Sequence, residues 1–123
     1  MLRGILATVA ACTQTTRFSI NSLSLTPDPP IVGQNSTLSI IYTNPGPVVS
    51  AGTAKYSISY NGLPYSQTDD LCKATTCPIE VGEHTVVSSA LWDGSLSGKI
   101  STTINWYDET GSNLLCVQTV IRT

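Results

Sequence analysis

The side chains whose type and spacing could support chemistry are four cysteines and a single histidine, His84. Cys72 and Cys77 have four residues between them, while Cys12 and Cys116 lie towards the two ends of the chain. The close pair is compatible with a metal site, a redox pair or a disulfide that closes a loop. A structural zinc site would need two close pairs or histidine partners, and the Cys-x-x-Cys redox spacing is absent. The even number of cysteines therefore favours two disulfides.

Hydrolytic catalysis is the second chemistry to consider. A Ser-His-Asp arrangement would have to use His84, and the sequence around it shows no nucleophile elbow. Asp69 and Asp70 could act as paired carboxylates, but acidic residues beside a predicted turn are more often solvated surface groups. The sequence therefore predicts neither an enzyme nor a protein with a metal or other cofactor.

The composition indicates a single β domain from an oxidising compartment. The 123 residues suffice for one continuous core, and 41% of them are hydrophobic but only 11% charged. Serine and threonine, which suit strands and turns, take the surface positions that Lys and Glu usually hold. The net charge is −2 and the six basic residues are scattered, so no nucleic-acid partner is predicted.

Targeting signals are few. The triplet Asn35-Ser36-Thr37 is an acceptor for N-glycosylation, which agrees with a secretory route. Residues 1–11 read either as a truncated signal peptide or as a first strand, and residues 12–123 as one domain. No run of 18 apolar residues occurs, so the sequence predicts no membrane-spanning segment.

Alternation of apolar and polar residues is the dominant pattern. It is clearest in residues 54–60, where Ala54, Tyr56, Ile58 and Tyr60 share one face, and it recurs in residues 36–43 and 99–106. Turn residues separate these segments, and a change of phase predicts a bulge near Asn21 and Ser22. Six or seven strands at this spacing predict an all-β fold, an antiparallel β-sandwich.

Two predicted turns carry large apolar residues. One contains Leu63, Pro64 and Tyr65, and the other contains Leu91, Trp92 and Leu96. Such residues either cap the end of a core or rim the mouth of a binding site. The pattern leaves both interpretations open.

The order of the motifs resembles the ML lipid-recognition family. The chain runs from Cys12 through "SLTPDPPIVGQNSTLSI", "YNGLPY" and "LCKATTCPIEVGEHTV" to "NWYDETGSNLLCV". This family includes the Niemann–Pick type C sterol-transfer proteins and the phosphatidylglycerol/phosphatidylinositol transfer proteins. The stretch "TPDPPIVGQN" looks most like the phospholipid-transfer branch.

The resemblance implies a fold and a pairing of the cysteines. It implies an immunoglobulin-like sandwich of two antiparallel sheets, splayed so that a lipid lies in a cavity between them. It also implies disulfides Cys12–Cys116 and Cys72–Cys77, with the second one near the cavity.

The function implied by the resemblance is binding and transfer of one lipid, with lipid as the ligand and transient contact with a membrane surface. Inward candidates from the strand pattern are Ile40, Tyr42, Tyr56, Ile58, Val87, Ile104, Trp106 and Val117. Candidates at the mouth are Leu63, Tyr65, Leu91, Trp92 and Leu96. Lys55, Lys73 or Lys99 would either meet the head group or remain solvated. Asp93 falls where the sterol branch is apolar, which places a phospholipid or fatty acid ahead of a sterol.

One rival function stays open. A sandwich of the same fold with a filled core and no ligand would be a structural or surface module, with other proteins as partners. In both cases we expect the protein to be secreted or to lie in the lumen of a vacuole- or lysosome-like compartment.

Overall fold

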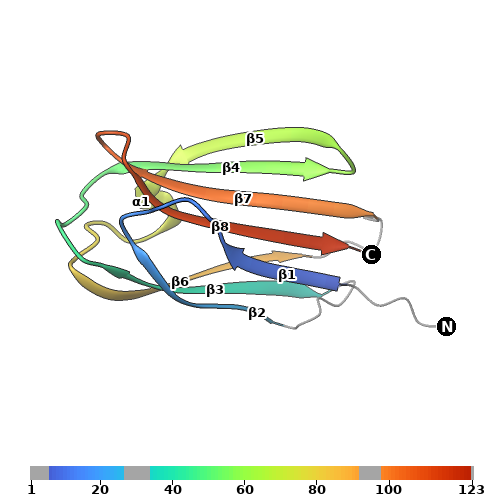
Figure 1. Cartoon of the computed structure of the whole chain (residues 1–123), viewed down its shortest axis with the longest axis horizontal. Helices are drawn as coiled ribbons and strands as arrows, with labels where there is room; N and C mark the ends of the chain where they lie inside the picture. Colours follow the sequence, from blue (N-terminus) through green and yellow to red (C-terminus); the bar gives the residue numbers. More distant parts are fainter. Residues whose placement is uncertain (1–5, 27–33, 92–97, 123) are drawn as a thin grey trace.

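The computed structural model describes residues 6–26, 34–91 and 98–122. Within these ranges the chain forms eight strands and one short helix (Figure 1). In chain order the elements are β1 (Leu6–Ala11), β2 (Ser19–Thr26), β3 (Asn35–Asn44), β4 (Gly52–Tyr60), β5 (Leu63–Asp70), α1 (Leu71–Ala74), β6 (Gly82–Leu91), β7 (Lys99–Asp108) and β8 (Asn113–Arg122). The predicted all-β antiparallel sandwich is confirmed.

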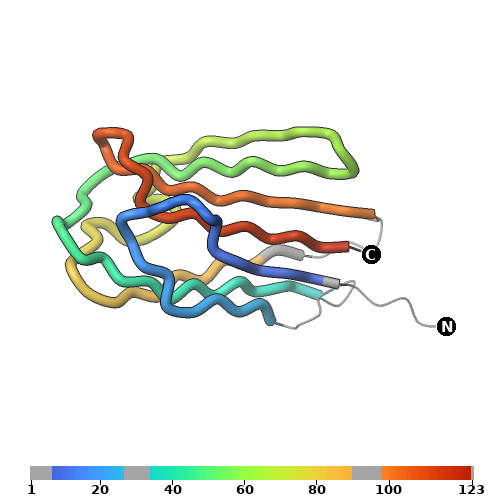
Figure 2. Tube along the Cα trace, viewed as in Figure 1, coloured from blue at the N-terminus to red at the C-terminus, as the bar shows by residue number. Residues whose placement is uncertain are grey.

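The two sheets are unequal in size. One has five strands in the order β1-β8-β7-β4-β5, and the other has three in the order β2-β3-β6. Figure 1 shows the larger sheet above the smaller one, with β5 as its outermost strand. The trace in Figure 2 shows the first strand beside the last, and the register pairs Leu6 with Arg122 and Ala11 with Val117.

The sequence explains the strand faces. In β4, Ala54, Tyr56 and Ile58 point inward, and Lys55 and Ser57 point to solvent. The irregularity predicted near Asn21 is confirmed, because the β2–β3 register shifts between Ile20 and Ser22. Such a bulge lets both halves of β2 direct apolar residues inward.

The turn at Asn61 and Gly62 joins β4 to β5. Both residues have positive φ, 49° and 86°, as the tight two-residue hairpin turns require. Leu63 and Tyr65 therefore belong to a strand, and the prediction that they lie in a turn is wrong. This strand was not predicted because it is the edge of its sheet and is exposed along nearly its whole length, so it lacks an apolar alternation.

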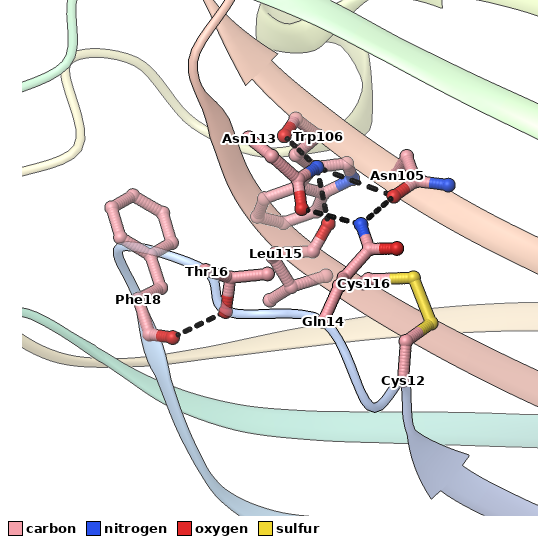
Figure 3. The surroundings of a disulfide bond; sticks show 9 residues. All are labelled: Cys12, Gln14, Thr16, Phe18, Asn105, Trp106, Asn113, Leu115 and Cys116. Atoms are coloured by element: carbon pink, nitrogen blue, oxygen red, sulfur yellow. Dashed lines mark hydrogen bonds between the residues drawn. A yellow bond between two sulfur atoms is a disulfide. The ribbon is translucent and has the colours of Figure 1, made fainter.

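Both predicted disulfides are confirmed. Cys12–Cys116 joins the residue after β1 to β8 across 104 positions of sequence, beside a backbone hydrogen bond from Cys12 N to Cys116 O of 3.1 Å. In Figure 3, Gln14 lies next to this bond and donates to Asn113 Oδ1 at 2.8 Å. Closing so long a loop stabilises by about 4–5 kcal/mol in the chain-entropy model.

The tightest part of the core lies at the end of the sandwich where β3 and β7 finish and β8 begins. Tyr42 is 1% exposed, stacks on Phe18 and meets Trp106 edge-on. Asn44, which is fully buried, donates to Pro47 O and Ile79 O at 3.1 Å and accepts from Gly46 N at 2.9 Å. These bonds satisfy buried backbone groups of the two loops that close this end of the sandwich.

Burial falls along the strands away from this closed end. In β7, Trp106 is 2% exposed, whereas Ile104 and Ile100 are only partly buried. In β4, Ala54 is fully buried, whereas Ile58 is partly buried. The inner faces are therefore packed tightly at one end and less tightly along the remaining length.

Candidate functional site

A cavity of about 350 Å³ lies between the two sheets, next to the closed end. Residues of four strands and of the clip segment, which is the loop of residues 70–77 closed by the Cys72–Cys77 disulfide, line it: Leu38 and Ile40 of β3, Tyr56 of β4, Lys73 and Ala74 of α1, Val86, Val87, Ser88 and Ser89 of β6, and Ile104 and Trp106 of β7. Walls from both sheets make this an inter-sheet site, where a sandwich that is not filled by its own side chains has room for a ligand.

The topology explains why these residues meet. The β3–β6 register places Ile40 opposite Val86, and the β4–β7 register places Tyr56 opposite Ile104. Directly opposite residues share a face of their sheet, so each pair forms one apolar patch. The two patches line the same cavity from opposite sheets.

The clip segment closes one side of the cavity. Asp70 caps α1 by accepting from Cys72 N at 2.8 Å, Thr75 N donates to Leu71 O at 3.0 Å, and the Cys72–Cys77 disulfide closes the loop. This segment carries the chain from β5 in the larger sheet to β6 in the smaller one (Figure 1). Lys73 and Ala74 thereby become part of the cavity lining.

The cavity is amphipathic. Ile40 and Trp106 at its inner part are 3% and 2% exposed, while Lys73 and Ser88 are exposed to solvent. An apolar chain would therefore lie inward and a polar group outward, because burial favours the apolar part and leaves the polar part hydrated.

Two of the lining residues, Tyr56 and Trp106, carry a polar group. Burial raises the pKa of the Tyr56 hydroxyl and the negative charge of Asp69 raises it further, so this group stays protonated near neutral pH. Trp106 Nε1 is buried and has no hydrogen-bond acceptor. An acceptor that reached it would remove a cost of about 1–3 kcal/mol.

The inner face of the larger sheet continues beyond the cavity onto β5. Leu63 is opposite Tyr60 and Tyr65 is opposite Ile58, so both side chains lie on the inner side of the sheet. Each is 58% exposed, because β5 is an outer strand. Two large apolar side chains are thus presented to solvent on the same face as the cavity.

The structure places the residues predicted from the sequence in several environments. Ile40, Tyr56, Val87, Ile104 and Trp106 line the cavity, whereas Tyr42 and Val117 are buried in the adjoining core. Ile58 lies further along the same face as Tyr56. The backbone of Leu91 ends β6, and Trp92, Asp93, Leu96 and the side chain of Leu91 lie outside the described residues.

The orientation of Val87 differs from the one predicted. Val87 is 56% exposed and is opposite Ser39 on the outer face of the smaller sheet, so the prediction that it points inward is wrong. Val86, opposite the buried Ile40, is the inward residue. Two adjacent valines followed by two serines leave the phase of the strand undetermined in the sequence.

The described residues contain no group of three or more His, Cys, Asp or Glu side chains that could hold a metal ion. In the same part of the chain, no helix is long and apolar enough to cross a membrane.

Two antiparallel sheets packed face to face, with a cavity lined from both of them, define an immunoglobulin-like β-sandwich. The chain belongs to the ML domain family, since the model of that family matches residues 7–123. ML domains are a family of lipid-binding and lipid-transfer proteins.

A relative and two solved structures illustrate the similarity. A Dictyostelium discoideum protein named "Putative phosphatidylglycerol/phosphatidylinositol transfer protein" is 29% identical over 111 residues, which cover 81% of this chain and 72% of the relative. A Niemann-Pick type C2 protein from Japanese carpenter ant has a TM-score of 0.68 at 14% identity, covering 92% of this chain and 96% of that one. Chicken MD-1, in complex with lipid IVa, has a TM-score of 0.60 at 16% identity, covering 100% and 93%. At these identities the two structures show the shared fold.

Proposed function

We propose that this protein binds one lipid molecule in the cavity between its sheets and transfers it between membranes without changing it chemically. The observation that carries the proposal is the inter-sheet cavity, apolar at Ile40 and Ile104 and polar where Lys73 meets solvent. A lipid that leaves a bilayer exchanges one apolar environment for another, and about 25 cal/mol per Å² of buried apolar surface then holds it against water. Membership of the ML domain family supports the same function.

A phospholipid or a fatty acid fits the site better than a sterol. Lys73, Ser88 and Ser89 give the solvent side of the cavity a charge and two hydroxyl groups, which suit a charged head group better than a single hydroxyl. The name of the Dictyostelium discoideum relative refers to phospholipid transfer, which agrees with this order of preference.

Native mass spectrometry of the purified protein, followed by lipid extraction, tests the proposal. We expect a population heavier than the polypeptide by the mass of one lipid, and we expect the loaded protein to deliver that lipid to acceptor vesicles. A protein that emerges empty and takes up neither phosphatidylglycerol, nor a fatty acid, nor cholesterol is a structural module with a filled core. The dense packing around Tyr42 is the observation that favours this second function.

The site also suggests how the protein meets a membrane. Leu63 and Tyr65 are exposed and lie on the face that leads into the cavity, so transient insertion of these side chains would bring the cavity to the bilayer surface. Two disulfides agree with a protein that is secreted or held in the lumen of a vacuole- or lysosome-like compartment.

Glycosylation at Asn35 is a further part of the proposal. Asn35 is exposed at the first position of β3, where a glycan would not disturb the core. If the chain passes through a eukaryotic secretory pathway, glycosidase treatment should lower its mass, and Asn35→Gln should abolish the shift. Full-length protein from such a host without a glycan would contradict this.

A further inference from the structure

We infer that the ligand is an amphiphile with one alkyl chain and an anionic head group, a carboxylate or a phosphate, and that Lys73 holds the head group. The inference rests on the proposed function, because it concerns the same cavity. It goes further in preferring a ligand with one alkyl chain over one with two, and in assigning a charge to the ligand.

The size of the cavity argues for one chain. A water-sized group takes about 30 Å³ of a liquid and a methylene group takes a similar volume, so 350 Å³ holds about a dozen methylene groups. The cavity cannot extend towards the closed end, where Tyr42 and Leu115 are 1% and 0% exposed and fill the space. One chain of this length fills the cavity, and a second chain would have to lie beyond it, along the less tightly packed length of the sandwich.

The charge at the mouth argues for an anion. Lys73 is the one charged side chain among the residues that line the cavity. In the described part of the chain, the only ion pair within 4 Å joins Arg17 to Asp108, so Lys73 has no carboxylate partner there. The backbone of Lys73 is held by the Asp70 cap and by the disulfide on either side of it, so the lysine side chain starts from a fixed point in the cavity lining.

The surroundings of the mouth place the head group on one side. Asp69 is opposite Ala54 and therefore lies on the inner face of β5, where its negative charge would repel an anion. Ser88 is exposed on β6, on the side of α1, and its hydroxyl can donate to an anionic oxygen. We therefore expect the head group between α1 and β6, away from β5.

Competition against a fluorescent fatty acid tests the inference. The probes are dodecanoate, dodecyl phosphate, dodecanol, dilauroylphosphatidylglycerol and cholesterol. We expect the two single-chain anions to bind about three- to tenfold more tightly than dodecanol, which matches one exposed charge-assisted contact. We expect Lys73→Ala and Lys73→Gln to abolish this preference while leaving the affinity for dodecanol unchanged. Lys73→Arg should preserve the preference, and Lys55→Ala, which removes an exposed lysine from the outer face of β4, should do the same.

The outcomes separate this inference from the proposed function. If dilauroylphosphatidylglycerol or cholesterol competes as well as dodecanoate, the single-chain class is wrong and lipid binding stands. If the preference for anions survives Lys73→Ala and Lys73→Gln, the role of Lys73 is wrong. If no probe binds the wild-type protein, lipid binding itself fails.

Discussion

Tyr42 and Phe18 stack with ring centroids 5.1 Å apart and planes 8° from parallel. Trp106 of the opposite sheet meets Tyr42 edge-on at 5.5 Å, so Tyr42 joins the two sheets at the closed end. The next inward residue of β3, Ile40, already lines the cavity. The contact between Tyr42 and Trp106 therefore closes the inner end of the cavity.

Loss of the stacked ring should destabilise the whole domain. We expect Phe18→Ala to lower the free energy of unfolding by about 3–5 kcal/mol, because a fully buried aromatic side chain is replaced by a void. Urea denaturation followed by tryptophan fluorescence measures this. Phe18→Leu, which fills most of the space, is the control and should cost clearly less. A loss below about 1 kcal/mol for Phe18→Ala would show that the closed end is not packed as described.

Val86 and Val87 form a matched pair for testing the cavity. We expect Val86→Asn to weaken lipid binding about tenfold, because it places an amide on the apolar wall opposite Ile104 and Tyr56. Val87 also borders the cavity, but its side chain lies on the exposed outer face, so Val87→Asn should weaken binding clearly less, by about twofold at most. Titration with a fluorescent fatty acid gives both affinities, and thermal unfolding shows whether each variant remains folded. Equal effects of the two substitutions would contradict the assignment of faces.

This pair also shows how far sequence reasoning extends to the site. Ile40, Tyr56, Ile104 and Trp106 lie in segments with clean alternation, so their faces follow from the pattern alone. In β6 the pattern contains two adjacent valines and then two serines, and only the pairing with β3 settles which valine faces inward. Register is a long-range property, and the local sequence does not contain it.

Tyr65 tests the proposed contact with membranes. We expect Tyr65→Ala to slow transfer of lipid from donor to acceptor vesicles about tenfold, since roughly 1–3 kcal/mol is lost when one large apolar contact is removed. The melting temperature should change by only a few degrees, because the side chain is 58% exposed. Ser66→Ala, on the opposite face of β5, is the control. Transfer at the wild-type rate by Tyr65→Ala would argue against a role for β5 at the membrane.

The strand that carries Tyr65 was not apparent in the sequence. A half-buried strand shows apolar alternation because one of its faces packs on a core. In the part of the chain that the structure describes, β5 pairs with β4 alone and is exposed along nearly its whole length, so its residues are under no such constraint. Edge strands of this kind can be assigned only once their neighbour is known.

Asp108 should make the fold sensitive to acid. Hydrogen bonds, first from the Thr110 hydroxyl and then from Ser112 N and Thr110 N, together with the charge of Arg17, hold the pKa of this carboxyl below its ordinary value. The stabilisation is therefore fully present above the ordinary pKa of about 4, and it is lost as the pH falls through the lower value of the folded state.

We expect Asp108→Asn to be less stable than the wild type at pH 6 and closer to it at pH 3. Urea denaturation at the two pH values measures the difference. Glu109→Gln, which removes the neighbouring carboxylate but none of these hydrogen bonds, should leave the pH dependence nearly unchanged. A constant gap between wild type and Asp108→Asn from pH 6 to pH 3 would contradict the lowered pKa.

The division of the strands between two sheets has a consequence for the kinetics of exchange. Within the described residues β6 pairs with β3, and β4 pairs with β5 and β7, so no backbone ladder joins β6 to β4, which line the cavity from opposite sheets. We expect the two sheets to separate at the cavity while the backbone pairing within each sheet stays intact, with the Tyr42–Trp106 contact and the α1 segment limiting the movement. The barrier to admitting or releasing a guest is then the transient wetting of the apolar walls, which rises with the length of alkyl chain exposed. Residence time should lengthen with each added methylene group, even where equilibrium affinity has reached its limit.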